Sequence, residues 1–336
     1  MFNFVHVGFG KCFSTTLQTI WMNSLNYQYN NGLTISLLLD QIINTEEKKV
    51  ADIVSRAETV LYSGTLKNWT NFPTPSENNE KTKVCSYEGL IPFFVYWDLD
   101  KDQHELKMHC AASLLSKTTD NVLILVRDPI RLIESSYAQY IKEGGYLNIA
   151  EFLQKFEIVD LAKVISIWQK YGISVSVFPV EMYANHELDF FKFCESTFGA
   201  LIPNYWSKDL NLKKNQTNYE GLKTQAIYNK LLQLSFDELS SRNYANLPEQ
   251  DKNKVLEAFK LTRTWGTRYH FQNLAIDDLK NTIKIFDKNL LDSVFRLGIT
   301  PDQKVIIQKT YLSTLKKYNA MIPFIPDYEM SLSKLS

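Results

Sequence analysis

Two separate stretches of the sequence combine groups that bind anions. In the first, VHVGFGKCFSTT at residues 5–16, an apolar run is followed by glycines, a lysine and three hydroxyl side chains. Glycine lets a ligand approach the backbone closely. A helix that begins near Ser14 would direct its free N–H groups and positive dipole end at that ligand, and Lys11 adds a full charge. The stretch predicts an anion site, although an ordinary strand-to-helix turn with a solvated lysine would look similar.

The second stretch is NVLILVRDPIRLIESSY at residues 121–137. Arg127 follows an apolar strand pattern, Asp128 and Pro129 open a predicted helix, and Ser135 comes eight residues after the arginine. In parallel α/β sheets, ligands bind at the carboxyl ends of strands. The two stretches therefore predict two anion-binding positions for one ligand. The alternative is that Arg127 pairs only with Asp128 or a helix end.

The first stretch departs from the Walker A pattern, which disfavours a site for ATP and magnesium. Val5 stands where that pattern needs its first glycine, and Cys12 follows the lysine instead of serine or threonine. The histidines His104 and His109 are five residues apart, which does not place them on one helical face. We expect no metal site. The cysteines fit no metal-ligand spacing and are expected to be reduced thiols: Cys12, Cys85, Cys110 and Cys194.

The composition predicts a folded chain without a global charge. Hydrophobic residues make up 45% of the 336 residues and aromatic residues 13%, which argues against disorder. Lys+Arg and Asp+Glu both total 37, so nothing indicates a nucleic-acid partner or an anionic membrane. The N-terminus lacks a secretion signal, and the apolar stretch at 89–97 is too short to span a bilayer. We expect a cytoplasmic protein without a membrane span.

Alternating strand and helix patterns predict an α/β fold with a central parallel sheet flanked by helices. The polar stretch 67–83 is expected to be a surface loop. Strands are predicted at 2–7, 59–63, 83–88, 121–126 and 174–180. Helices are predicted at 15–25, 35–57, 104–117, 129–142, 159–171 and 187–198.

After about residue 205 only helical patterns remain. Thr300 and Pro301 are the expected N-cap and first residue of the last predicted helix. We therefore predict two domains, an α/β core at 1–204 and a helical C-terminal part at 205–336. The helices of this second part are predicted near 219–235, 249–263, 276–295 and 301–318.

Taken together, these motifs resemble those of sulfotransferases that use 3′-phosphoadenosine 5′-phosphosulfate (PAPS). VHVGFGKCFSTTLQ is similar to their 5′-phosphosulfate loop, and LVRDPIRLIESSY is similar to their 3′-phosphate motif. VCSYEGL at 84–90 looks like a strand end of the bacterial, carbohydrate-type branch, and residues 177–199 resemble the strand and helix that follow. The resemblance covers about residues 1–200 in matching order, with weaker support at 212–217 and in the C-terminal helix.

The resemblance implies a P-loop-like sulfotransferase fold and a metal-free enzyme that transfers sulfate from PAPS to an acceptor hydroxyl, with a carbohydrate or glycan favoured. Lys11 would stabilise charge on the leaving phosphate, while Arg127 and Ser135 would hold the 3′-phosphate. The 5′-phosphosulfate loop would consist of Gly10, Lys11, Cys12, Phe13, Ser14, Thr15 and Thr16.

Two positions in the loop depart from the family pattern. Phe13 replaces a glycine, and a bulky side chain does not readily adopt positive φ. Cys12 replaces a hydroxyl residue, which removes a good hydrogen-bond donor. A sulfotransferase-like protein that binds a nucleotide without catalysis is therefore one alternative, and a P-loop-type kinase is another.

Two residues compete for the role of general base. Glu88 ends the predicted strand 83–88, on the same rim as Lys11 and Arg127, and the glycan-type branch has a glutamate at the matching point. His109 resembles the histidine of the small-molecule branch, but it lies within a predicted helix, where a structural role is more common. We favour Glu88.

Four aromatic side chains could stack on a sugar ring of the acceptor. Core packing is the ordinary role of each one taken singly. They are Trp69, Phe93, Phe94 and Trp97.

Overall fold

The computed structural model describes most of the first two hundred residues and the C-terminal helices. The predicted loop at 67–83, apart from its last three residues, and nearly all of the three predicted helices between 219 and 295 lie outside this description. The described residues are 1–9, 12, 14–45, 49–62, 81–97, 101–181, 186–206, 222, 225–226, 229–230, 233, 250, 299–318 and 325–333.

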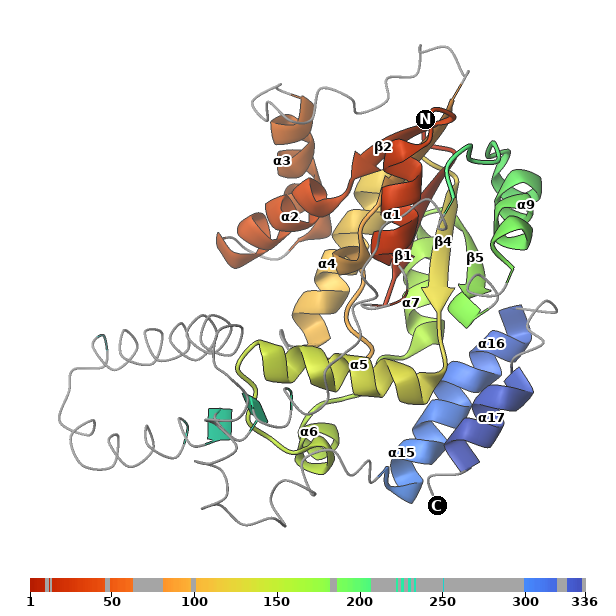
Figure 1. Cartoon of the computed structure of the whole chain (residues 1–336). Coiled ribbons are helices and arrows are strands. Elements are labelled where there is room, and N and C mark those ends of the chain that lie inside the picture. Colours follow the sequence, from red (N-terminus) through yellow and green to blue (C-terminus); the bar gives the residue numbers. More distant parts are fainter. Residues whose placement is uncertain are drawn as a thin grey trace, which may run out of the picture. The chain divides into compact units, whose positions relative to one another are not determined.

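The centre of the fold is a five-stranded sheet in which every neighbouring pair is parallel (Figure 1). Its order is β2-β3-β1-β4-β5. Strands β1 and β3 are buried along their whole length and β4 nearly so, as expected of a sheet covered on both faces. The predicted α/β class with a central parallel sheet is confirmed. The strands are β1 (Phe4–Gly8), β2 (Tyr27–Asn31), β3 (Thr82–Ser86), β4 (Asn121–Val126) and β5 (Ser174–Pro179).

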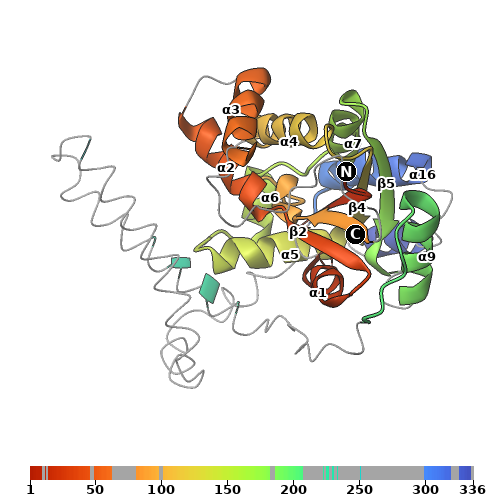
Figure 2. The same cartoon turned by 90° about the horizontal axis from the view of Figure 1, so that it is seen from above.

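Helices cover both faces of the sheet, with α1 on one face and α4 and α7 on the other (Figure 2). The short η1 is a 3-10 helix and η5 is a π-helix. In chain order, the helices of the described residues are α1 (Ser14–Asn23), α2 (Leu33–Thr45), α3 (Val50–Tyr62), η1 (Glu88–Leu90), α4 (Lys101–Leu115), α5 (Pro129–Lys142), α6 (Ile149–Lys155), α7 (Leu161–Lys170), α9 (Glu187–Phe198), α15 (Pro301–Ile306), η5 (Ile307–Leu312), α16 (Ser313–Tyr318) and α17 (Ile325–Ser333).

The strand order creates a switch point between β1 and β4. Strand β1 is central, and the chain leaves it towards β2 on one side. Strand β4 lies beside β1, and the chain leaves it towards β5 on the other side. The two connections therefore diverge at the carboxyl edge, which is where open α/β sheets bind ligands.

The chain divides into two compact units. The first contains residues 1–133, 158–211 and 301–334, and the second contains 134–157, 212–300 and 335–336. The C-terminal helices α15 to α17 thus belong to the same unit as the sheet. Helix α15 begins at Pro301, as predicted. The predicted domain boundary at 204/205 stays a prediction.

Three details of the predicted elements are wrong. Residues 59–62 of the predicted strand 59–63 are the end of helix α3, because Ile53, Val54, Ala57 and Leu61 continue one buried helical face. The predicted helix 35–57 is two helices, α2 and α3.

Strand β2 was not predicted. Its sequence, YQYNN, is mostly polar, as suits an edge strand that buries only its first residue.

The third wrong detail is the position of Glu88. Strand β3 ends at Ser86, and Glu88 begins the 3-10 helix η1 instead of ending the strand. No helix among the described residues is both long and apolar enough to cross a membrane.

Candidate functional site

The loops after β1 and β4 leave adjacent strands at the same edge of the sheet. Gly8, the last residue of β1, pairs with Leu125 near the end of β4. Helix α1 begins at Ser14 and α5 at Pro129, each directly after its loop. The structure thus brings together the start points of the two predicted anion-binding stretches.

Three predicted residues of the first loop, Gly10, Lys11 and Phe13, lie outside the described residues. Cys12, which lies among them in the chain, is described: it is buried, and its backbone N–H donates to the Phe9 oxygen over 3.2 Å. Their predicted roles remain predictions.

Gly8 does not use the freedom that glycine offers. It is part of β1, its φ is not positive, and a Cβ there would make ordinary contacts, with Leu125 Cβ at 3.5 Å. Gly8 therefore continues β1 as an ordinary strand residue, and the close approach of a ligand to the backbone there stays a prediction.

A buried hydroxyl marks the start of helix α1. Ser14 is 2% exposed, and its Oγ has no hydrogen-bond partner within the described part of the chain. Thr15 is exposed and Thr16 is half-buried. Leaving a buried polar group unpaired costs about 1–3 kcal/mol. The Ser14 hydroxyl is thus a donor held ready at the positive end of a helix dipole.

A side-chain network ties α1 to the carboxyl edge. His6 Nδ1 lies 2.7 Å from Ser86 Oγ, which also accepts a hydrogen bond from Gln18 Nε2 over 3.2 Å. The His6 ring also packs edge-on against Trp21 of α1, with centroids 5.4 Å apart. Burial lowers the pKa of His6 to about 3, so the ring is neutral at physiological pH. Sequence reasoning did not identify this network.

The C-terminal helices hold the turn after β4. The Tyr311 hydroxyl, from η5, donates to the Arg127 oxygen over 2.5 Å and accepts from the Arg127 N–H over 3.1 Å. Its ring contacts Phe94, which in turn contacts Phe9 after β1. Burial raises the pKa of Tyr311 well above its usual value, so the phenol remains protonated. The backbone of Arg127 is thus fixed from outside the sheet.

The next residue, Asp128, is held by a second connection. Its N–H donates to Glu181 Oε1 over 3.0 Å, and Glu181 Oε2 accepts from the Tyr328 hydroxyl of α17 over 2.5 Å. Asp128 Oδ1 accepts from the N–H of Ile130 over 2.8 Å and so caps α5. Glu181 was missed, although it follows β5 by two residues and the rule that selected Arg127 could have found it.

The charged groups of the edge act on one thiol. Burial raises the pKa of Cys12, the positive charge of Arg127 lowers it, and the carboxylates of Glu181 and Glu88 raise it. These three charged side chains come from the ends of β4, β5 and β3. The predicted residues Cys12, Arg127 and Glu88 are therefore close enough to interact electrostatically, together with the unpredicted Glu181.

The two candidates for the base lie at different ends of the sheet. Glu88 follows the carboxyl end of β3 and is half-buried. His109 lies within α4, and its Nδ1 is 3.3 Å from the hydroxyl of Tyr171, which ends α7 just before β5 begins. Burial lowers the pKa of His109, and the charge of Lys170 lowers it further. Glu88 is thus the candidate at the rim, whereas His109 lies towards the amino ends of the strands.

Ser135, the predicted partner of Arg127 for the 3′-phosphate, lies on α5 and belongs to the second unit. Its role stays a prediction.

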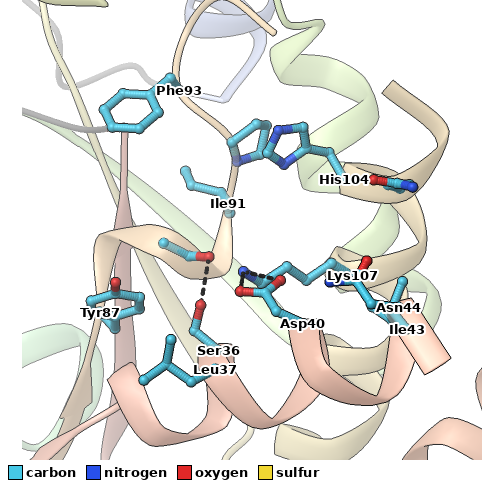
Figure 3. Close-up of a pocket in the computed structure, with 13 residues that line it drawn as sticks. Ser36, Leu37, Asp40, Ile43, Asn44, Tyr87, Ile91, Phe93, His104 and Lys107 are labelled. Atoms are coloured by element: carbon cyan, nitrogen blue, oxygen red, sulfur yellow. Dashed lines mark hydrogen bonds and ion pairs between the residues drawn. The ribbon is translucent and has the colours of Figure 1, made fainter. Parts of the chain in front are cut away.

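A cavity of about 430 Å³ lies between α2, α4 and the segment around η1 (Figure 3). Asp40 of α2 and Lys107 of α4 meet inside it, with Nζ 2.7 and 2.8 Å from the two carboxylate oxygens. Tyr87 and Gly89, which flank Glu88, line its wall. Gly89 is needed there, because a Cβ would lie 2.3 Å from the Tyr87 ring.

The aromatic residues suggested for sugar contact have different positions. Phe93 lines the cavity. The ring of Trp97 packs against the Phe93 ring, with the two centroids 5.5 Å apart. Phe94 is fully buried core, and Trp69 lies outside the described residues.

Comparisons with family models, curated proteins and solved structures find no match to this chain. Within the described residues, no group of three or more His, Cys, Asp or Glu side chains is placed to hold a metal ion. The structure thus places Arg127 and Glu88 after strands of one sheet edge, and the chain neighbours of Glu88, Tyr87 and Gly89, line the cavity.

Proposed function

We propose that this chain is a PAPS-dependent sulfotransferase with a P-loop-like fold, acting on an acceptor hydroxyl, most favourably that of a carbohydrate or glycan. One observation carries the proposal. The loops that resemble the 5′-phosphosulfate and 3′-phosphate motifs leave adjacent strands, β1 and β4, at a switch point of the sheet. The resemblance rests on the residues of these motifs and their order in the sequence. It does not depend on the adjacency of the two strands, which is what a single ligand with two phosphate groups requires.

The chemistry needs few groups. In the reaction, the acceptor oxygen forms a bond to sulfur while the bond from sulfur to the 5′-phosphate oxygen breaks, releasing adenosine 3′,5′-bisphosphate (PAP). Lys11 and the amino end of α1, with the Ser14 hydroxyl, stabilise the charge that develops on the leaving phosphate. Arg127 and Ser135 bind the 3′-phosphate. Positioning and electrostatics supply most of the catalysis, as in phosphoryl transfer.

Glu88 takes the proton of the acceptor hydroxyl in this mechanism. Its place supports the role, because it lies after β3, beside the central strand, and its charge acts on Cys12 in the first loop. The acceptor would then approach from the side of η1, where the cavity lies.

A second candidate is a protein that binds PAP or PAPS without transfer. The observation that favours it is Cys12, whose buried thiol has a raised pKa and is a weak donor where the family has a hydroxyl.

Calorimetry and a transfer assay separate these possibilities. Titration with PAP in EDTA should show binding without a divalent metal, and labelled PAPS should pass its sulfate to an acceptor from a glycan panel. PAP binding without any transfer would favour the non-catalytic protein. Absence of PAP binding together with tight binding of ATP and magnesium would refute both and favour a kinase.

A further inference from the structure

The cavity between α2 and α4 has a balanced pair of charges at its centre. Lys107 is 8% exposed, and both oxygens of Asp40 contact its ammonium group. Figure 3 shows the two side chains reaching towards each other from the two helices. A buried ammonium needs such a partner, because an uncompensated charge in this setting is strongly destabilising. The pair therefore presents hydrogen-bonding atoms to the cavity but no net charge.

Two further side chains of the cavity, those of Ser36 and Tyr87, are uncharged hydrogen-bonding groups. Ser36 donates to the Gly89 oxygen over 3.3 Å, which joins α2 to the η1 segment. Burial raises the pKa of Tyr87, and the carboxylates of Glu88 and Asp40 raise it further, so its phenol is a neutral donor. Phe93 and His104 add ring surfaces to the lining. Rings combined with several hydrogen-bonding groups suit a compact molecule with many hydroxyls.

The position of the cavity connects it to the proposed reaction. Tyr87 and Gly89 line it, and Glu88 lies between them in the chain. The pKa of Tyr87 responds to Glu88 on one side and to Asp40 on the other, so the cavity and the candidate base are neighbours. A volume of about 430 Å³ is within the ordinary range of small-molecule sites.

We propose that this cavity binds an uncharged, hydroxyl-bearing ligand and that the Asp40–Lys107 pair excludes charged ones. The assignment of that ligand as the sulfate acceptor rests on the proposed function. Each member of the pair cancels the charge of the other, so removing one member should change which charge the cavity accepts. The preference of the cavity for neutral ligands can therefore be changed towards anions or towards cations.

The test uses three pyranosides of similar size that differ in the group at C6: neutral methyl glucoside, anionic methyl glucuronide and cationic methyl 6-amino-6-deoxyglucoside. Binding to the whole 336-residue chain is measured by saturation-transfer NMR and calorimetry at a pH where free imidazoles are neutral and the amine of the cationic probe is protonated. Wild type should bind the neutral glucoside best. Asp40→Asn should shift the preference to the anionic glucuronide, and Lys107→Met to the cationic 6-amino-6-deoxyglucoside, each by about tenfold.

Two further variants keep the test decisive. Leu37 lines the cavity but is 58% exposed, so Leu37→Arg should fold normally and also shift the preference towards the glucuronide. Glu58→Gln is the matched control, because it removes a carboxylate that pairs with Lys117 outside the cavity lining. It should leave all three affinities unchanged.

Wild type that binds none of the probes, or that prefers a charged one, would overturn the inference. So would preferences that neither Asp40→Asn nor Leu37→Arg alters. Titration with PAP in parallel separates this result from the proposed function. Normal PAP binding with no glycoside selectivity refutes the cavity site alone, whereas the reverse pattern refutes sulfate transfer and leaves the cavity site standing.

Discussion

Tyr311 satisfies both backbone hydrogen-bonding groups of Arg127 with a single hydroxyl, donating to the oxygen over 2.5 Å and accepting from the N–H over 3.1 Å. A π-helix near the C-terminus thereby fixes the residue that we expect to bind the 3′-phosphate. Such helices often occur at functional sites.

Tyr311→Phe should weaken PAP binding without changing the ligand-contacting side chains. The loss leaves the Arg127 N–H without this partner, and unfolding should become easier by about 1–3 kcal/mol. Calorimetry with PAP and chemical denaturation measure the two effects. Tyr137→Phe is the control, because it also removes a hydroxyl bonded to a backbone oxygen, that of Leu147, but in the other unit. Equal loss of PAP affinity in both variants would contradict the positioning role.

Arg127→Ala should discriminate between two nucleotides. Loss of a charge-assisted contact to the 3′-phosphate should weaken PAP binding roughly ten- to a hundredfold. Binding of adenosine 5′-phosphosulfate, which lacks that phosphate, should remain unchanged. Competition calorimetry with both ligands makes the comparison, and an equal loss for both would show that Arg127 contacts something else.

Lys11→Ala should lower turnover more than it lowers PAP affinity. The lysine is expected to interact most strongly with the charge that develops on the bridging oxygen, so its effect belongs to the transition state. Steady-state kinetics with labelled PAPS, compared with PAP titration, gives both values. A loss confined to affinity would reduce Lys11 to a ground-state contact.

Glu88→Gln should retain PAP binding while turnover falls by about two orders of magnitude, because the acceptor proton loses its base. His109→Ala is the counterpart, since the structure places His109 against Tyr171 near the amino ends of the strands. Its turnover should stay near that of wild type. The opposite pattern would make the small-molecule branch the better model.

His6 should make the fold sensitive to acid. Its folded pKa is about 3, below the ordinary value of 6.5, because burial disfavours the charged ring. The unfolded chain therefore binds one more proton between these values, and stability falls as the pH drops from about 6.5 towards 3.

The variant His6→Gln removes this group, so its unfolding free energy should depend less steeply on pH, by up to about 1.4 kcal/mol per pH unit. Denaturation curves across the window test this. The control is His186→Gln, whose side chain is 63% exposed. Parallel slopes in wild type and His6→Gln would refute the assignment.

The elements that the sequence predicted well carry strong local patterns. NVLILV predicted β4, since the five consecutive apolar residues after Asn121 suit a strand covered on both faces. Pro129 and Pro301 marked the starts of α5 and α15. The edge strand β2 escaped notice because its residues are mostly polar. The end of α3 looked like a strand because it contains the β-branched Thr59 and Val60 and the aromatic Tyr62.

The contacts that shape the candidate site could not be predicted in the same way. Arg127 and Glu88 were found because each follows a strand pattern. Tyr311 and Lys107 carry no local signal, since their partners are 184 and 67 residues away in the chain. Only the fold reveals that a phenol near the C-terminus supports the turn after β4, or that a lysine on one helix balances an aspartate on another.

The bond between Arg127 and Tyr311 also has a consequence for biosynthesis. The two residues are separated by 184 positions, so at about 5–20 residues per second the ribosome needs roughly 10–40 s after making one before it makes the other. During that interval the sheet can form, but the turn after β4 lacks its support. A nascent chain should therefore form its sheet before it gains affinity for the nucleotide, because that affinity requires Tyr311 to have been made.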